Sequence, residues 1–218
     1  MCDTSLVAIG LTVFLSNNIY GIASPFLPVI LAEIGISSTW IGLIFASYAI
    51  AGTIVSIFIG GVLDKIGHKQ VMATGCLLMA AACVAFGLCK YLDDNKIIII
   101  CGIILRALQG SASAMINTTC YSYGAKVYPD NVDKVVALME TMAGTGCVTG
   151  PLLGSFIYGL VGFEWTFIGF GIAMAPSAFL VLLLKNPKDA KQVAVKDDKD
   201  ETLDVNEPIV AAPAIVLD

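Results

Sequence analysis

Arg106, in the stretch ILRALQG, is the only arginine of this 218-residue chain and the residue whose chemistry most needs explaining. Nine uncharged residues, IIIICGIIL, precede it, and residues 107–125 carry no charge. An arginine keeps its proton in a protein, and a charge at membrane depth costs at least ~2.5–3.5 kcal/mol. Charges placed there usually mark ion or substrate pathways. We therefore interpret Arg106 and Gln109, one turn further on, as part of such a pathway; a structural arginine bound to backbone carbonyls is the alternative.

Glu140 is the second charge inside an apolar run. It lies six residues after Lys134, or about 9 Å along a helix. Three roles are open for its carboxylate: an ion pair with Arg106, a proton carrier, or a side chain that reaches back to the membrane surface.

The first apolar run contains the polar stretch FLSNNIYG, residues 14–21. These side chains either line a cavity or form hydrogen bonds between helices. The pathway residues proposed from this stretch are Ser16, Asn17, Asn18 and Tyr20.

Two glycine-containing motifs have no reactive group of their own. GGVLDKIGHK follows the pattern G-x-x-x-D-(R/K)-x-G-x-(R/K) and is either a functional loop motif or an ordinary basic cytoplasmic turn; its residues are Gly60, Asp64, Lys65, Gly67 and Lys69. GTGCVTGPLLG places small residues four apart on one helix face, as in overlapping GxxxG pairs, which predicts a glycine-lined, kinked helix that packs closely on a neighbour. Its residues are Gly144, Gly146, Gly150, Pro151 and Gly154.

The elements that must position these residues are apolar helices. The chain is 57% hydrophobic and 13% charged, against roughly 25% charged in soluble domains. About 20 apolar residues cross a bilayer as a helix. The sequence predicts an all-α membrane domain over residues 1–185, with six transmembrane helices at about 5–31, 38–63, 70–89, 97–125, 135–160 and 165–184.

Charges between the runs predict the orientation. Lysines follow the second, fourth and sixth runs, whereas single glutamates, Glu33 and Glu164, stand in two connections on the other side. The excess of lysine on cytosolic loops predicts that both termini are cytosolic, in a vesicle, another endomembrane or the plasma membrane. Residues 186–218 are acidic and of mixed charge, and are predicted to be a disordered cytoplasmic tail or linker.

Composition also excludes several classes of protein. No Ser–His–Asp set, carboxylate dyad or phosphate loop is visible, so no enzyme is predicted, and neither a cofactor, a metal site nor nucleic-acid binding is expected.

The seven cysteines lack metal spacing. Cys89 and Cys101 flank one connection and would be able to pair in an oxidising space.

Taken in order, the loop motif, the arginine of the fourth run and G-x-x-x-G-P in the fifth resemble the N-terminal half of a major facilitator superfamily transporter. SPFLP, LMETMAGTG, TGPLLGSFIYGLVGFEW and AKVYPDN are similar to the vesicular amine transporter family, most to its polyamine branch. Glu140 matches a glutamate of that branch. Ser16 stands where monoamine members carry an acidic residue, which argues against monoamines, and His68 departs from the usual basic residue of the loop motif.

The resemblance implies proton-coupled antiport of small organic cations, amines or polyamines, by two six-helix halves that rock around a central site. It implies that Arg106 couples proton movement, that Asp64 and Lys65 latch the halves together, and that the glycine-proline helix lets them close. The implied partners are the lipid bilayer, protons, a small-molecule substrate, and a second six-helix half from the same full-length chain or from a homodimer. The alternative is a half-size membrane protein that does not transport alone and acts as a subunit or regulator.

Overall fold

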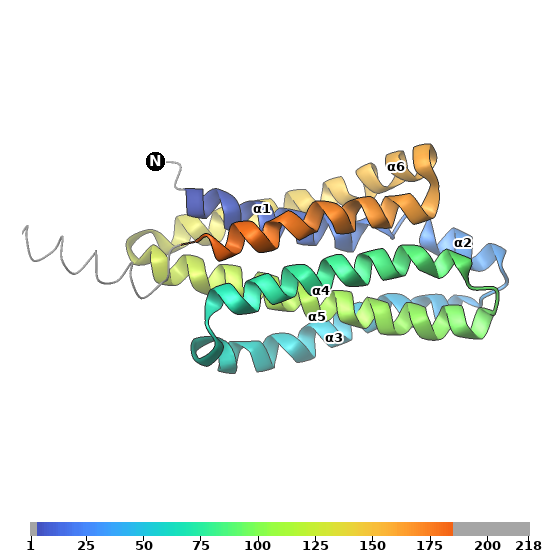
Figure 1. Cartoon of the computed structure of the whole chain (residues 1–218), viewed down its shortest axis with the longest axis horizontal. Coiled ribbons are helices and arrows are strands. Elements are labelled where there is room, and N and C mark those ends of the chain that lie inside the picture. Colours follow the sequence, from blue (N-terminus) through green and yellow to red (C-terminus); the bar gives the residue numbers. More distant parts are fainter. Residues whose placement is uncertain (1–3, 185–218) are drawn as a thin grey trace, which may run out of the picture. The chain divides into compact units, whose positions relative to one another are not determined.

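The computed structural model describes residues 4–184, and the regular secondary structure in that range is helical (Figure 1). The helices are α1 (Thr4–Ile22), α2 (Leu27–Glu33), α3 (Ser38–Ile66), α4 (His68–Leu88), α5 (Asn95–Val127) and α6 (Val132–Leu182), with 3-10 turns η1 (Cys89–Tyr91) and η2 (Pro129–Asn131). The tail predicted at 186–218 and the Asp64 side chain lie outside the described residues. Five helical segments in this part of the chain are long and apolar enough to cross a membrane: Thr4–Glu33, Ser38–Leu63, His68–Tyr91, Asn95–Val127 and Pro129–Leu182.

The first of these segments, Thr4–Glu33, overlaps the run predicted at about 5–31 and is interrupted by a turn. α1 ends at Ile22, and α2 begins at Leu27. Pro25 and Pro28 have no N–H and cannot complete an uninterrupted helical ladder. The backbone N–H of Leu27 instead bonds to the carbonyl of Ala23 at 3.0 Å, which links the two helices through a short turn.

α6 covers the last two predicted runs, 135–160 and 165–184, up to Leu182. Its 51 residues are broken at one position, Gly162, with φ 80° and ψ −178°. Glycine adopts this positive φ without the steric cost that a Cβ would add. Figure 1 shows α6 folding back here, so that its two arms run side by side. Gly162 therefore forms the connection between the two helical runs.

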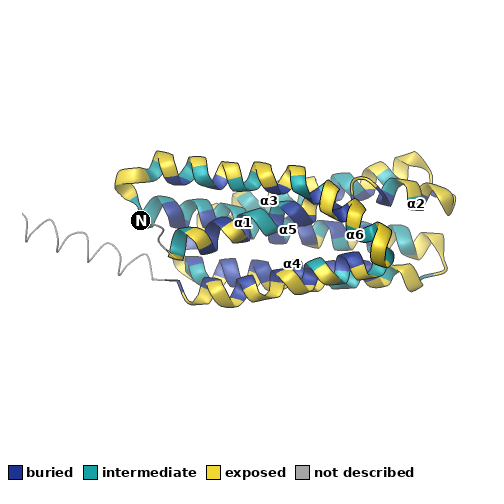
Figure 2. Cartoon of the chain, turned by 90° about the horizontal axis from the view of Figure 1, so that it is seen from above, coloured by how far each residue is buried: buried dark blue, intermediate teal, exposed yellow. Residues whose placement is uncertain are grey.

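The helices bury a shared interior and expose apolar side chains around it. α1 packs on α6, α3 on α5, and α4 on both α5 and α6. Buried residues face the spaces between helices, and exposed ones follow the outer faces (Figure 2). Large apolar side chains are prominent among the exposed ones, including Ile50, Ile54, Ile57, Phe58, Val148, Leu152, Phe156 and Leu160. An apolar surface of this extent requires lipid or another protein surface around it.

The seam between α1 and α6 is formed by glycines that meet backbone carbonyls. A Cβ added at Gly146 would lie 2.5 Å from the Phe14 oxygen, at Gly150 2.6 Å from the Asn18 oxygen, and at Gly154 2.8 Å from the Ile22 oxygen. Real Cβ atoms do not approach so closely, so these positions require glycine for the two backbones to touch.

We predict that Gly150→Ala destabilises the bundle by about 1–3 kcal/mol, because the new methyl group overpacks a backbone contact. The measurement is thermal unfolding of the detergent-solubilised chain, followed by size-exclusion chromatography. Gly144→Ala is the matched control on the same helix, since a Cβ there meets nothing within 4 Å. Equal melting temperatures for the two variants would contradict the seam.

Candidate functional site

Arg106 lies on α5 in the interior of the bundle and is 1% exposed. Its Nη1 donates to Gln109 Oε1 at 3.3 Å. The guanidinium carbon lies 5.2 Å from the Phe45 ring centroid and 5.3 Å from that of Phe86. Gln109 is itself buried, and its Nε2 lies 3.5 Å from the carbonyl oxygen of Ala82. The arginine is thus held by one amide and two aromatic rings.

Two donor atoms of this guanidinium are left over. Nε and Nη2 have no hydrogen-bond partner among the described residues. Cation–π contacts offset part of the desolvation, by about 0.5–2 kcal/mol each, but they do not replace a hydrogen bond to an ionised donor, worth about 1.5–3 kcal/mol. A buried cation with free donors is a position that an acceptor group would stabilise.

Further polar residues continue from Arg106 along one face of α5. We call them the polar stripe: Arg106, Gln109, Ser113, Asn117 and Tyr121. The intervals of three and four residues place them above one another on the helix. Asn117 Nδ2 donates to Ser113 Oγ at 3.0 Å, so the stripe is partly linked within its own helix.

α1 adds two polar residues to the stripe. Ser16 Oγ donates to Ser113 Oγ at 3.3 Å, and Asn17 Nδ2 to Asn117 Oδ1 at 3.3 Å. Asn17 Nδ2 also donates to the backbone oxygen of Val13 at 2.8 Å. Ser16 and Asn17 therefore form hydrogen bonds between α1 and α5.

The other two polar residues of α1, Asn18 and Tyr20, contact residues outside the polar stripe. Asn18 Nδ2 donates to Thr149 Oγ1 on α6 at 2.8 Å, whereas its buried Oδ1 has no partner in the described part of the chain. Tyr20 is 47% exposed. Its ring lies 4.9 Å, centroid to centroid, from that of Tyr48, a buried tyrosine near Arg106.

Glu140 lies at the far end of the stripe and forms no ion pair with Arg106. It is exposed, and its Oε1 accepts a hydrogen bond from Tyr121 Oη at 3.0 Å. Tyr121 is 15 residues beyond Arg106 on the same helix, or about 22 Å away. The predicted possibility of direct pairing is wrong for this structure, and the stripe runs instead from a buried cation to an exposed carboxylate.

The loop motif is spread over the α3–α4 junction. Gly67, with φ 101°, is the single residue between the two helices. Gly60 and Lys65 are exposed, and Lys69 Nζ lies 3.5 Å from the Leu182 carbonyl oxygen near the end of α6.

The glycine-proline motif divides into two parts. Gly146, Gly150 and Gly154 form the seam with α1, where Pro151 meets Gly21, while Gly144 faces open space. Elsewhere, Cys89 and Cys101 are free thiols.

Sequence reasoning missed several residues of the stripe. Ser113, Asn117, Tyr121 and Thr149 are not among the candidates that the sequence analysis singled out. The spacing of polar residues every four positions from Gln109 to Tyr121 would have revealed three of these four. Tyr48 gave no comparable signal, because one tyrosine in an apolar run is an ordinary core residue.

Comparison with known proteins identifies the family of this chain. The profile of the Major Facilitator Superfamily matches residues 9–216. MFS-type transporter SLC18B1 of Homo sapiens is 31% identical over 166 residues, 75% of this chain and 36% of that protein. Chloramphenicol resistance protein CraA of Acinetobacter baumannii is 25% identical over 173 residues, 79% of this chain and 40% of its own length.

A further relative is multidrug transporter MdfA of Edwardsiella piscicida, 29% identical over 157 residues, 72% of this chain and 36% of MdfA. The chain thus aligns with roughly a third to two fifths of the length of these relatives. Its apolar helices make it an integral membrane protein, and the match over residues 9–216 shows that it belongs to the Major Facilitator Superfamily.

Proposed function

We propose that this chain is the N-terminal half of a secondary active transporter that exchanges protons for small organic cations, amines or polyamines. The observation that carries the proposal is the polar stripe, a row of polar side chains that extends from a buried cation with free donors to the tyrosine that binds an exposed carboxylate. Intramembrane ionisable groups of this kind are typical of proton and substrate pathways. The printed names of the relatives, which include MFS-type and multidrug transporters, support transport as the activity.

In the proposed mechanism, the substrate cavity lies against the exposed end of the stripe. Glu140 binds either a proton or a cationic substrate, because one carboxylate is neutralised by only one of them at a time. Arg106 alternates between its present contacts and an acceptor that reaches Nε and Nη2. Gln109, Ser16, Asn17, Asn18 and Tyr20 line the route between these two charges.

The motifs without reactive groups have mechanical roles in this proposal. The loop motif, Gly60, Asp64, Lys65, Gly67 and Lys69, latches this half to a second one on the cytosolic side. Gly146, Gly150, Gly154 and Pro151 keep α1 and α6 in contact while the halves rock, and Gly144 leaves room for the facing surface. The second half belongs to the same full-length chain or to a second copy, and its docking would cover exposed apolar side chains.

We also propose that α6 crosses the bilayer twice, which gives six crossings and cytosolic termini. A straight helix of 51 residues would extend about 76 Å at 1.5 Å per residue, far beyond a hydrocarbon core of about 30 Å. Single cysteines replacing Lys134, Glu164 and Leu183 in a cysteine-free chain test this topology. We expect a membrane-impermeant thiol reagent added from the cytosol to label the first and third, and not the second. Labelling of all three from one side would contradict the double crossing.

We predict that Arg106→Gln reduces proton-gradient-driven uptake of a radiolabelled polyamine by the full-length transporter at least about tenfold, the effect of losing hydrogen bonds to a charged donor. Arg106→Lys keeps the charge without the planar fork and should recover only part of the uptake. Both variants are checked for correct folding by size-exclusion chromatography. Unchanged gradient-driven uptake in a folded Arg106→Gln variant would refute the role of this residue.

We predict that Glu140→Gln abolishes the stimulation of uptake by a pH gradient, because the amide does not exchange a proton. Tyr121→Phe removes only the hydrogen bond to Glu140 and should lower uptake less. Asp133→Asn, an exposed acidic residue seven positions earlier on the same helix, is the matched control and should leave the pH stimulation intact. A pH response that survives Glu140→Gln would move the proton site elsewhere.

A further inference from the structure

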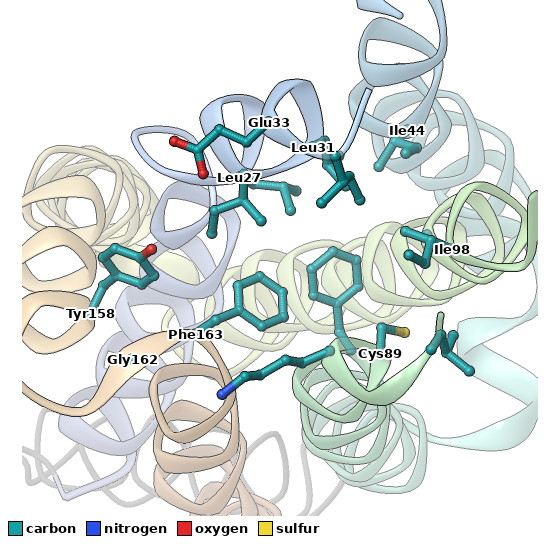
Figure 3. Close-up of a pocket in the computed structure, with 15 residues that line it drawn as sticks. Leu27, Leu31, Glu33, Ile44, Cys89, Ile98, Tyr158, Gly162 and Phe163 are labelled. Atoms are coloured by element: carbon teal, nitrogen blue, oxygen red, sulfur yellow. The ribbon is translucent and has the colours of Figure 1, made fainter. Parts of the chain in front are cut away.

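A cavity of about 440 Å³ lies away from the polar stripe, at the end of the bundle formed by α2, η1 and the Gly162 turn (Figure 3). Residues from α2, α3, α4, α5 and α6 line it. Its volume lies within the range of small-molecule sites, about 300–1,000 Å³. None of the residues assigned above to the pathway, the loop motif or the glycine-proline motif lines it.

The cavity has apolar and aromatic walls. Figure 3 shows side chains converging from several helices, among them Leu27, Leu31, Ile44, Ile98 and Phe163. The Phe163 ring belongs to a cluster with Phe86, Phe26 and Phe167 at centroid distances of 4.8–6.2 Å. Such walls fit the apolar body of a ligand, and aromatic faces also attract cations.

The negative charges at the cavity outnumber the positive ones. Lys90 Nζ lies 3.6 Å from Glu164 Oε2, so the charge of Lys90 is already neutralised. Glu33 also lines the cavity, and its exposed carboxylate has no ion-pair or hydrogen-bond partner among residues 4–184. One negative charge is therefore left at the mouth, which favours a ligand with one positive charge.

The charge of Arg106 determines which end of such a ligand would lie deep in the cavity. Phe86 lines the cavity, and its ring centroid is also 5.3 Å from the guanidinium carbon of Arg106. A cationic group placed deep in the cavity would approach that guanidinium and be repelled. The cationic end is thus favoured at Glu33, with the apolar end toward Phe86.

We propose that this cavity is a binding site for an amphipathic monocation, with its ammonium group at Glu33 and its apolar body between Phe86 and Phe163. The site does not depend on the transport mechanism above and shares no residue with the polar stripe. Its contact with the stripe is the Phe86 ring, so an occupant that displaces this ring also removes one of the supports of Arg106.

The test measures saturable binding of radiolabelled phenylbutylammonium to the full-length protein in nanodiscs of zwitterionic lipid. Phenylbutanol and phenylbutyrate have the same apolar body with a neutral and a negative end. We expect the ammonium to bind most tightly and the carboxylate least. Equal affinities for the ammonium and the alcohol would overturn the proposal.

Variants separate this cavity from any other cation site in the protein. Glu33→Gln should weaken ammonium binding roughly fivefold, the upper range for an exposed ion pair, and leave the alcohol unchanged. Asp133→Asn removes an exposed carboxylate at the start of α6 and should change neither affinity. Lys90→Gln should tighten ammonium binding, because Glu164 loses its partner.

Filling the cavity tests its position directly. Ile98→Trp should abolish binding of both the ammonium and the alcohol. Unchanged binding in a folded Ile98→Trp variant would overturn the proposal. If that variant does not fold, the exposed Glu33→Gln substitution still decides, since an unaltered preference for the ammonium over the alcohol would equally overturn it.

Discussion

The buried charge of Arg106 is the constraint on which the arrangement of the other helices depends. The guanidinium remains protonated in the bundle interior, so its surroundings must supply electron-rich groups. Phe45 of α3, Phe86 of α4 and Gln109 of α5 do so from three helices. These helices converge on one charge near the middle of α5, and that convergence leaves two of its donor atoms free. The same contacts that stabilise the arginine therefore leave it incompletely satisfied.

From this charge the environment changes gradually along α5. Arg106, Gln109 and Ser113 are buried, Asn117 and Tyr121 are partly buried, and the series ends at the exposed Glu140. Side-chain hydrogen bonds in low-dielectric surroundings are stronger than in water and polarise one another. The hydrogen bonds Tyr121–Glu140, Asn117–Ser113 and Arg106–Gln109 are separate links along this face, so a change of charge at Glu140 acts directly on Tyr121 alone.

Most helix positions could be predicted from the sequence, because membrane length imposes them. α3, α4 and α5 begin and end within about three residues of the predicted runs. The break between α1 and α2 follows from Pro25 and Pro28, but its position depends on local hydrogen bonds. The connection in α6 was predicted too long, since its composition did not reveal that Gly162 alone would adopt a positive φ.

The site was less predictable than the helices. Arg106 and Gln109 stood out because polar residues are rare in apolar runs, and charge alone suggested Glu140. Whether Glu140 meets Arg106 depends on how far along their helices the two lie, which the identity of the residues does not determine. Tyr48 and the cavity beside Glu33 depend on contacts between distant segments, and no local pattern encodes them.

The regular glycine contacts between α1 and α6 limit how these helices can slide. The three carbonyls, on Phe14, Asn18 and Ile22, repeat every four residues, as do the glycines opposite them. A displacement of a fraction of a turn would drive side chains against carbonyl oxygens, whereas a displacement of one full repeat, about 6 Å, would bring two of the glycines onto new carbonyls. The seam therefore allows α1 and α6 to slide along each other only in steps of a whole repeat. For any smaller sliding movement, α1 and the first arm of α6 move together as one rigid unit.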